Sequence, residues 1–163
     1  MYVPLYPRRR KLPSPDVCDR LDLETMVYYV AHLLNLRVEN LRIVGVAHAV
    51  DGRFLLKGTS LTCMGSAVQF RSYYLVHLGL GCPSFPDFVD TLLHELVHVH
   101  LWQSGRHQYY NGHYVRWDGR HYHQNRRQRR GQDRRAYLAA PWEQEARRQA
   151  AELYRILKTD HVI

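Results

Sequence analysis

The stretch LLHELVHVH, residues 92–100, holds two histidines four positions apart, with a glutamate directly after the first of them. If the stretch is helical, His94 and His98 lie one turn apart on one face, where both rings can bind the same metal ion. Glu95 lies about 100° round the helix from His94, so it can reach a water bound by that ion without being a ligand. This arrangement is typical of zinc hydrolases and makes a metallopeptidase the first hypothesis.

The flanking residues predict where this helix begins and ends. Ser84 is a good N-cap, Pro86 suits the first turn, and Asp87 suits the positive end of the helix dipole. Gly105 is a natural stop, so we expect a helix from about residue 85 to 104. Its apolar residues cluster on the side opposite the two histidines, which would leave the histidines facing a cleft: Val89, Leu92, Leu93, Leu96 and Val97.

Length and composition place the chain in a broad class. Its 163 residues, 45% of them hydrophobic, are enough for one globular domain with a sizeable core. No apolar run approaches the roughly eighteen residues of a membrane span, and the N-terminus lacks the apolar core of a secretory signal. Cys18, Cys63 and Cys82 are scattered without a CxxC motif, which indicates free thiols in a reducing compartment. We therefore expect a cytoplasmic protein that does not enter the membrane.

The formal charge of +8 is concentrated in two short segments. Arg8–Lys11 carries +4, and the stretch from residue 125 to 135, which contains Arg126–Arg135, carries +5. The rest of the chain holds 13 basic and 14 acidic residues and is close to neutral. Such segments are typical of solvated flexible loops. The alternative is contact with a nucleic acid, an acidic partner or a virion surface.

The N-terminal half predicts one helix and several strands. Residues 1–15, with four prolines and the first basic cluster, are expected to form a flexible arm, and residues 16–163 a single domain. Apolar residues at helical spacing predict a first helix over residues 16–36. Short β-like runs follow at residues 41–47, 54–57 and 72–80, with Asp51-Gly52 as a hairpin turn between the first two.

The C-terminal half predicts an insert and a closing helix. Asn111-Gly112 and Asp118-Gly119 are turn dipeptides within the insert and basic loop, residues 106–139. They indicate a small meander with strands at residues 109–110, 113–117 and 120–123. Pro141 is favourable in the first turn of a last helix that reaches about residue 158.

This order of elements indicates an α+β fold. It is similar to the minimal zincin plan, in which a small, mainly antiparallel sheet packs over the active-site helix, followed here by a β-rich insert and a C-terminal glutamate helix. The strand at residues 72–80 is expected to lie nearest the cleft and to present its edge to an extended peptide.

A third ligand is needed, because zinc hydrolases use three protein ligands and leave a fourth position to water. The metzincin motif requires glycine at position 101 and histidine at 104, where this chain has Leu101 and Ser104, so that class is excluded. His100 lies about 200° from His98 and cannot join the same site from the same helix. We expect it to be a buried or capped histidine.

The closing helix offers two glutamates that point about 200° apart, so only one of them can face the metal. The buried stripe of this helix is expected to contain Trp142, Ala146, Ala150, Leu153 and Leu157. Glu143 lies nearer the centre of that stripe and is the predicted ligand. Glu145 is the alternative.

Together the two helices resemble a known family. His94-Glu95-x-x-His98 followed by Glu143-x-x-Ala146 is similar to the gluzincin pattern HExxH…ExxA, over roughly residues 70–155. The most similar members are small bacteriophage-encoded proteins, through these motifs and through Gly112, Trp117-Asp118-Gly119 and Tyr137. The resemblance implies one Zn²⁺ held by His94, His98 and Glu143, with Glu95 as general base. Related families carry Asp or Asn four residues after the ligand glutamate to orient a ligand histidine, whereas this chain has Arg147.

Three functions follow as hypotheses. The first is a zinc metalloendopeptidase acting on an extended polypeptide, in which Glu95 moves the proton. Its oxyanion donor stays unassigned among five candidates: His113, Tyr114, His121, His123 and Tyr137. The second is a zincin-fold binding or virion-structural protein with a stabilising or vestigial metal site. The third is a protease acting on nucleic-acid-associated proteins, held to phosphates by the two basic segments.

Overall fold

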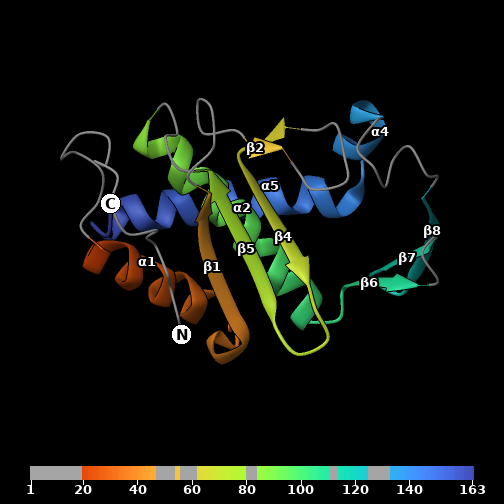
Figure 1. The fold of residues 1–163 in the computed structure, drawn as a ribbon, viewed down its shortest axis with the longest axis horizontal. Helices are drawn as coiled ribbons and strands as arrows, with labels where there is room; N and C mark the ends of the chain where they lie inside the picture. Colours follow the sequence, from red (N-terminus) through yellow and green to blue (C-terminus); the bar gives the residue numbers. More distant parts are fainter. Residues whose placement is uncertain (1–19, 47–53, 56–61, 80–83, 111–113, 125–132) are drawn as a thin grey trace.

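The α+β class predicted from the sequence is confirmed by a computed structural model, which describes residues 20–46, 54–55, 62–79, 84–110, 114–124 and 133–163 (Figure 1). Within these residues the helices are α1 (Arg20–Leu33), η1 (Val38–Asn40, a 3-10 turn), α2 (Phe85–Gln103), α4 (Arg134–Leu138) and α5 (Pro141–Thr159). Both motif-bearing helices match their predicted bounds to within one or two residues. The reason is that their ends carry local signals: the Ser84 side chain caps Asp87 N at 3.2 Å, and Pro141 opens α5.

The main sheet contains β1 (Leu41–Val46), β5 (Tyr74–Gly79) and β4 (Gly65–Gln69), in the order β1-β5-β4. The outer strands β1 and β4 pair with β5 in parallel and antiparallel directions respectively. The expectation that residues 72–80 present a free edge is therefore wrong, because both edges of β5 are paired. The edge strand beside the helices is β4, which the sequence did not reveal because GSAVQ is small and polar for a strand.

The second correction concerns the predicted hairpin between residues 41–47 and 54–57. The strand β2 (Phe54–Leu55) pairs with β3 (Thr62–Cys63), and β1 pairs with β5. The turn dipeptide Asp51-Gly52 lies outside the described residues. The sequence LRIVGV of β1 alternates little between apolar and polar residues, which suits a strand in a parallel pair better than one in an exposed hairpin.

The insert forms the predicted meander, a sheet of β6 (His107–Tyr110), β7 (Tyr114–Trp117) and β8 (Arg120–His123) in that order. Asp118 and Gly119 both have positive φ, 45° and 82°, as a tight two-residue hairpin turn requires. In Figure 1 the insert extends from one end of the molecule, away from α1. After it, Arg134–Leu138 is helical where the sequence suggested basic loop, because the Asp133 side chain caps Ala136 N at 3.0 Å.

The core surrounds α2, which packs against β4 and β5 on one side and α5 on another. Its residues from Leu92 to Leu101 are almost all inaccessible; Leu92, Leu93, Leu96, Val97, Val99 and Leu101 are 0% exposed. Each such side chain stabilises the fold by roughly 1.5–3 kcal/mol. On α5, Ala146 and Ala150 are buried and small, so the two helices approach closely. None of the described helices combines the length and hydropathy needed to cross a bilayer.

Candidate metal centre

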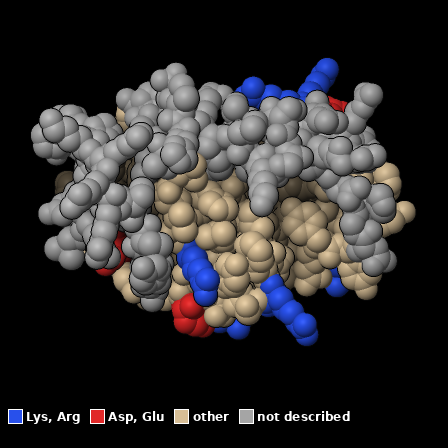
Figure 2. All heavy atoms as spheres, viewed as in Figure 1, with Lys and Arg blue, Asp and Glu red and all other residues tan. Residues whose placement is uncertain are grey.

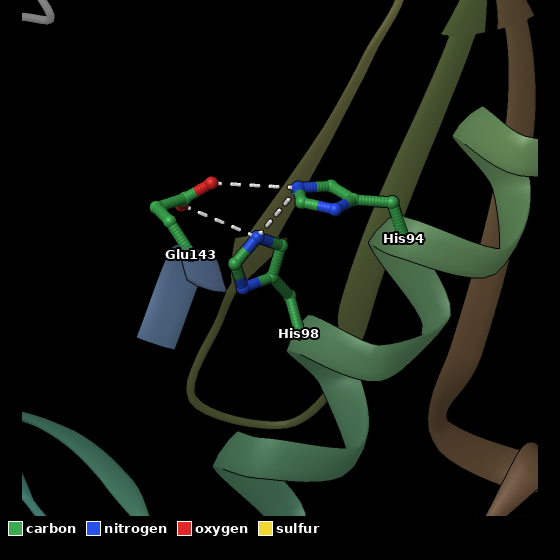
Figure 3. Close-up of side chains that lie close together, drawn as sticks. All are labelled: His94, His98 and Glu143. Carbon is green, nitrogen blue, oxygen red and sulfur yellow. Dashed lines mark hydrogen bonds and ion pairs between the residues drawn. The ribbon is translucent and has the colours of Figure 1, made fainter. Parts of the chain in front are cut away.

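Two helices bring three potential ligands together (Figure 3). His94 and His98 project from one face of α2, and Glu143 reaches them from the first turn of α5. The two histidine Nε2 atoms are 3.1 Å apart, and they lie 3.4 Å (His94) and 3.3 Å (His98) from the two Glu143 oxygens. The structure thus assembles the three side chains that the sequence pattern pairs, with all candidate ligand atoms within 4.8 Å of one another.

These separations fit a metal ion. Metal bonds of about 2.0–2.1 Å at tetrahedral angles place two donor atoms roughly 3.3 Å apart, close to all three observed distances. Glu143 is 3% exposed, and its buried Oε2 atom makes no hydrogen bond of good geometry, with His94 Nε2 3.4 Å away. A buried carboxylate is costly unless charged or hydrogen-bonding groups compensate it, and a cation between these three side chains would do so directly. Two imidazole nitrogens with one carboxylate form a donor set for a divalent transition metal.

The Glu143 carboxyl group is held in its charged form. Burial alone would raise its pKa, but hydrogen bonds with His94 and His98, the charge of His98 and a hydrogen bond with Tyr137 outweigh that effect. The pKa of Glu143 consequently lies well below its ordinary range. An ionised carboxylate is the form that binds a cation.

The alternative ligand, Glu145, faces away from the cluster. Its carboxylate accepts hydrogen bonds from Arg106 (3.2 Å), Arg148 (3.0 Å) and Gln149 (2.7 Å). The Arg148 bond is the largest of the effects that lower the pKa of Glu145 to about 2. Glu143 therefore faces the two histidines, whereas Glu145 faces Arg106 and Arg148, as expected for residues about 200° apart on a helix.

Glu95 is buried beside the cluster, between α2 and the edge strand β4. It is 7% exposed and accepts a hydrogen bond from the Ala67 backbone N–H. Burial raises the pKa of Glu95 to about 7; the charge of His94 opposes this effect, that of Glu143 adds to it and the Ala67 bond opposes it. A carboxyl group of this pKa can both accept and return a proton near neutral pH.

A glycine makes room for Glu95. A Cβ atom on Gly65 would lie 2.9 Å from Glu95 Cγ and 3.0 Å from its Oε1, and 2.5 Å from the Thr91 methyl group. The two carbon–carbon separations are shorter than real contacts, and the contact with the oxygen is tight. The absence of a side chain at residue 65 is therefore what lets β4 lie against the glutamate.

Two tyrosines border the site. Tyr137, on α4, is hydrogen-bonded to Glu143, and its pKa is raised by burial and then by the charge of that carboxylate. Tyr109, on β6, is 57% exposed as a residue, yet desolvation of its hydroxyl group and then the charge of Glu143 raise its pKa to about 12. Among the described candidates for the oxyanion donor, only Tyr137 is hydrogen-bonded to one of the three candidate ligands, His94, His98 and Glu143, which we call the triad.

The other candidate donors belong to the insert. The Tyr114 and His123 rings meet edge to face with centroids 5.3 Å apart, and His121 meets Tyr110 in the same way at 6.0 Å. These contacts are aromatic packing within the meander. His113 lies outside the described residues.

Sequence reasoning missed an aromatic cluster beneath the site. Trp102, one turn after His98, stacks on that histidine with centroids 6.1 Å apart and donates from Nε1 to His107 Nδ1 at 3.1 Å. His107 is 1% exposed and stacks on Trp142 at 5.0 Å. Burial, followed by the charge of His98, lowers the pKa of His107 to about 3, so this ring is neutral. The four-residue spacing of His98 and Trp102 was the available signal.

Two further residues lie as the sequence suggested, outside the cluster. His100 is half-buried and hydrogen-bonded to the backbone of Leu34. Arg147 is exposed, and the buried Nδ1 atom of His98 has no hydrogen-bond partner. The position that orients a ligand histidine in the families that the motif resembles therefore supplies no such contact here.

A groove continues from the site along β4. It has a volume of about 450 Å³ and is lined by residues 67–71, Trp102 and Tyr109. Because Ala67 also bonds Glu95 and Trp102 also stacks on His98, the groove adjoins the cluster directly.

Most of the predicted basic surface lies outside the described residues. Arg8–Lys11 and residues 125–132 lie outside the described residues, while Arg134 and Arg135 are exposed on α4. On the described part of the face in Figure 2, Lys and Arg side chains stand apart and form no continuous patch.

Comparison of this chain with protein-family models, with curated proteins and with solved structures finds no match in any of the three. The case for a function therefore depends on the geometry and chemistry of the cluster itself.

Proposed function

We propose that this chain is a zinc-dependent metallopeptidase of the gluzincin type, with a zincin-like fold. His94, His98 and Glu143 would hold the metal, and Glu95 would be the general base. One observation carries the proposal. Three candidate ligands from α2 and α5 lie together, and the buried carboxyl group of Glu95, also on α2, lies beside them at the edge strand β4. A purely structural metal site has no use for the fourth group.

The chemistry divides between the metal and the chain's own residues. Zinc held by the triad would polarise the carbonyl of a peptide bond and lower the pKa of a water molecule toward 7. Glu95 takes a proton from the attacking water at a carboxylate oxygen and returns it to the nitrogen of the leaving amine. The Tyr137 hydroxyl lies beside Glu143, and by turning its single proton from that carboxylate to the carbonyl oxygen it would stabilise the negative charge that develops there.

The substrate would be an extended polypeptide paired with β4. Phe70 N donates to Tyr73 O, and Met64 O accepts from Gly79 N, both at 2.8 Å. Even-numbered residues of β4 therefore face β5. The odd-numbered residues Gly65, Ala67 and Gln69 turn their backbone groups to the outer edge. The Ala67 N–H is used by Glu95; within the part of the chain that the structure describes, the Ala67 carbonyl and both backbone groups of Gln69 stay available to a peptide.

Metal content and cleavage, measured on the same preparations, test the proposal. We expect about one zinc per chain and cleavage of an unfolded protein substrate by the wild type. Glu95→Gln should keep the zinc and lower the rate at least about a hundredfold, since general-base catalysis contributes that much. Glu143→Ala should lose the zinc, and Glu152→Ala, exposed on the same helix, should change neither property. A zinc-loaded wild type that cleaves no unfolded protein would overturn the proposal in favour of a structural metal.

A further inference from the structure

We propose that the groove at the end of β4 is a subsite for a bulky apolar side chain of the peptide. The chain would then prefer extended peptides with an aromatic or large aliphatic residue two or three positions from the scissile bond. This inference rests on the proposed peptidase function and adds a substrate class to it. It is carried by the composition, rigidity and placement of the groove.

Three of the seven residues that line the groove are aromatic, Phe70, Trp102 and Tyr109; the polar residues are Gln69 and Arg71. Phe70 and Tyr109 are exposed, at 42% and 57%, and the buried Trp102 contacts both Tyr109 and the candidate ligand His98. The Trp102 and Tyr109 rings are 6.4 Å apart at their centroids. A volume of about 450 Å³ holds a large side chain with room to spare. Isolated exposed aromatic residues need no explanation, but two that border one groove beside a buried tryptophan indicate a binding surface.

The exposed ring of Phe70 is held in place. It stacks on Tyr73 with centroids 4.5 Å apart and an interplanar angle of 14°. The guanidinium of Arg42 covers Tyr73 at 4.3 Å from the ring centroid. This three-layer stack fixes the side chain of Phe70 before a ligand binds. Little side-chain entropy is therefore lost when a ligand packs against it.

The position of the groove sets the distance from the reacting bond. Glu95 contacts β4 at Gly65 and Ala67, whereas the groove is centred on the other end of the strand and the turn that follows. An extended peptide advances about 3.3 Å per residue, like the strand that it pairs with. A side chain opposite Gln69 or Phe70 is thus two or three residues from a bond held beside Glu95.

The test uses zinc-loaded Glu95→Gln, which binds without turnover, and fluorescein-labelled eight-residue peptides. Each pair of peptides differs by Phe or Ala at one scanned position, and dissociation constants come from fluorescence polarisation. We expect Phe to bind at least about ten times more tightly than Ala at one position, because the ring leaves water. Adding Phe70→Ala should reduce that ratio to about two, and Phe70→Leu should restore part of it. Adding Tyr28→Ala, an exposed aromatic on α1, should leave the ratio unchanged.

Equal affinities at every position, or a ratio that Phe70→Ala does not change, would overturn the subsite. The two proposals fail in different ways. Selective binding by Glu95→Gln with no cleavage by the wild type would retain the subsite and reject the peptidase. Cleavage by the wild type without preference for Phe over Ala would retain the peptidase and reject the subsite.

Discussion

At the scale of single residues, the site depends on the absence of a side chain at Gly65 as much as on its four polar groups. A methyl group there would meet both Glu95 and the Thr91 methyl group. Glu95 is the group that must be placed within hydrogen-bond reach of the attacking water, so its displacement affects the rate more than metal binding.

Gly65→Ala should therefore lower kcat by about ten- to a hundredfold with zinc content unchanged, and should destabilise the fold by roughly 1–3 kcal/mol. Thr91→Ser removes the closest contact while keeping the hydroxyl that donates to Asp87 O at 2.7 Å. The double variant should recover stability but not kcat, as measured by urea unfolding and peptide cleavage. Full recovery of kcat in the double variant would show that displacement of Glu95 is not the cause.

Tyr137→Phe tests the proposed oxyanion donor. Removing the hydroxyl should lower kcat by about ten- to a hundredfold, with KM and zinc content nearly unchanged, because the bond to the carbonyl oxygen strengthens only in the transition state. Tyr114→Phe, whose ring packs on His123, is the matched control and should have no effect on kcat. A Tyr137→Phe variant with wild-type kcat would remove this residue from the mechanism.

At the scale of elements, an ionic network joins the insert to α5. Arg106, just before β6, is paired with Asp118 at 2.8 Å and with Glu145 at 3.2 Å. The hydrogen bond from Arg106 lowers the pKa of Asp118. The pKa of Glu145 is lowered to about 2, most strongly by the hydrogen bond from Arg148 and also by that from Arg106. The network therefore holds the meander and the aromatic cluster against the helix that carries Glu143.

This network predicts a pH dependence of stability. The folded-state pKa of Glu145 lies below its ordinary value near 4.5, so its contribution is complete above about pH 5 and is lost as the pH falls toward 2. Glu145→Gln should cost about 1 kcal/mol at pH 7, since the group is only partly shielded from solvent. The difference from wild type should shrink as the pH is lowered, in urea unfolding of metal-free protein. A difference that stays constant down to pH 2 would contradict the role of the charge.

At the scale of the whole molecule, a metal ion held by the triad would add a link between α2 and α5, two helices far apart in the sequence that pack against each other in the core. Binding only to the folded state raises the unfolding free energy by about 2.7 kcal/mol when free zinc is a hundred times its dissociation constant. Chelation should therefore lower the Tm, and added zinc should restore it. Glu143→Ala should show no such shift in differential scanning calorimetry. An equal zinc-dependent shift in that variant would place the metal elsewhere.

The elements that the sequence predicts well are those set by local signals. Helix caps and a 3.6-residue period are local, so α2 and α5 were predicted almost to the residue, as was the turn at Asp118-Gly119. Strand pairing is not local. The partner of β1 is β5, some thirty residues along the chain, and nothing in either run specifies a parallel pair.

By itself, the sequence determined which side chains share a helix face: His94 with His98, and Glu143 on the opposite side of α5 from Glu145. The tertiary structure alone decided that β4 is an edge strand among the described residues, that Glu95 is buried against Gly65, and that Tyr137 and Trp102 border the triad. The physical reason is that a helical face follows from bond geometry within a few residues, whereas burial and pairing depend on which distant segments pack together.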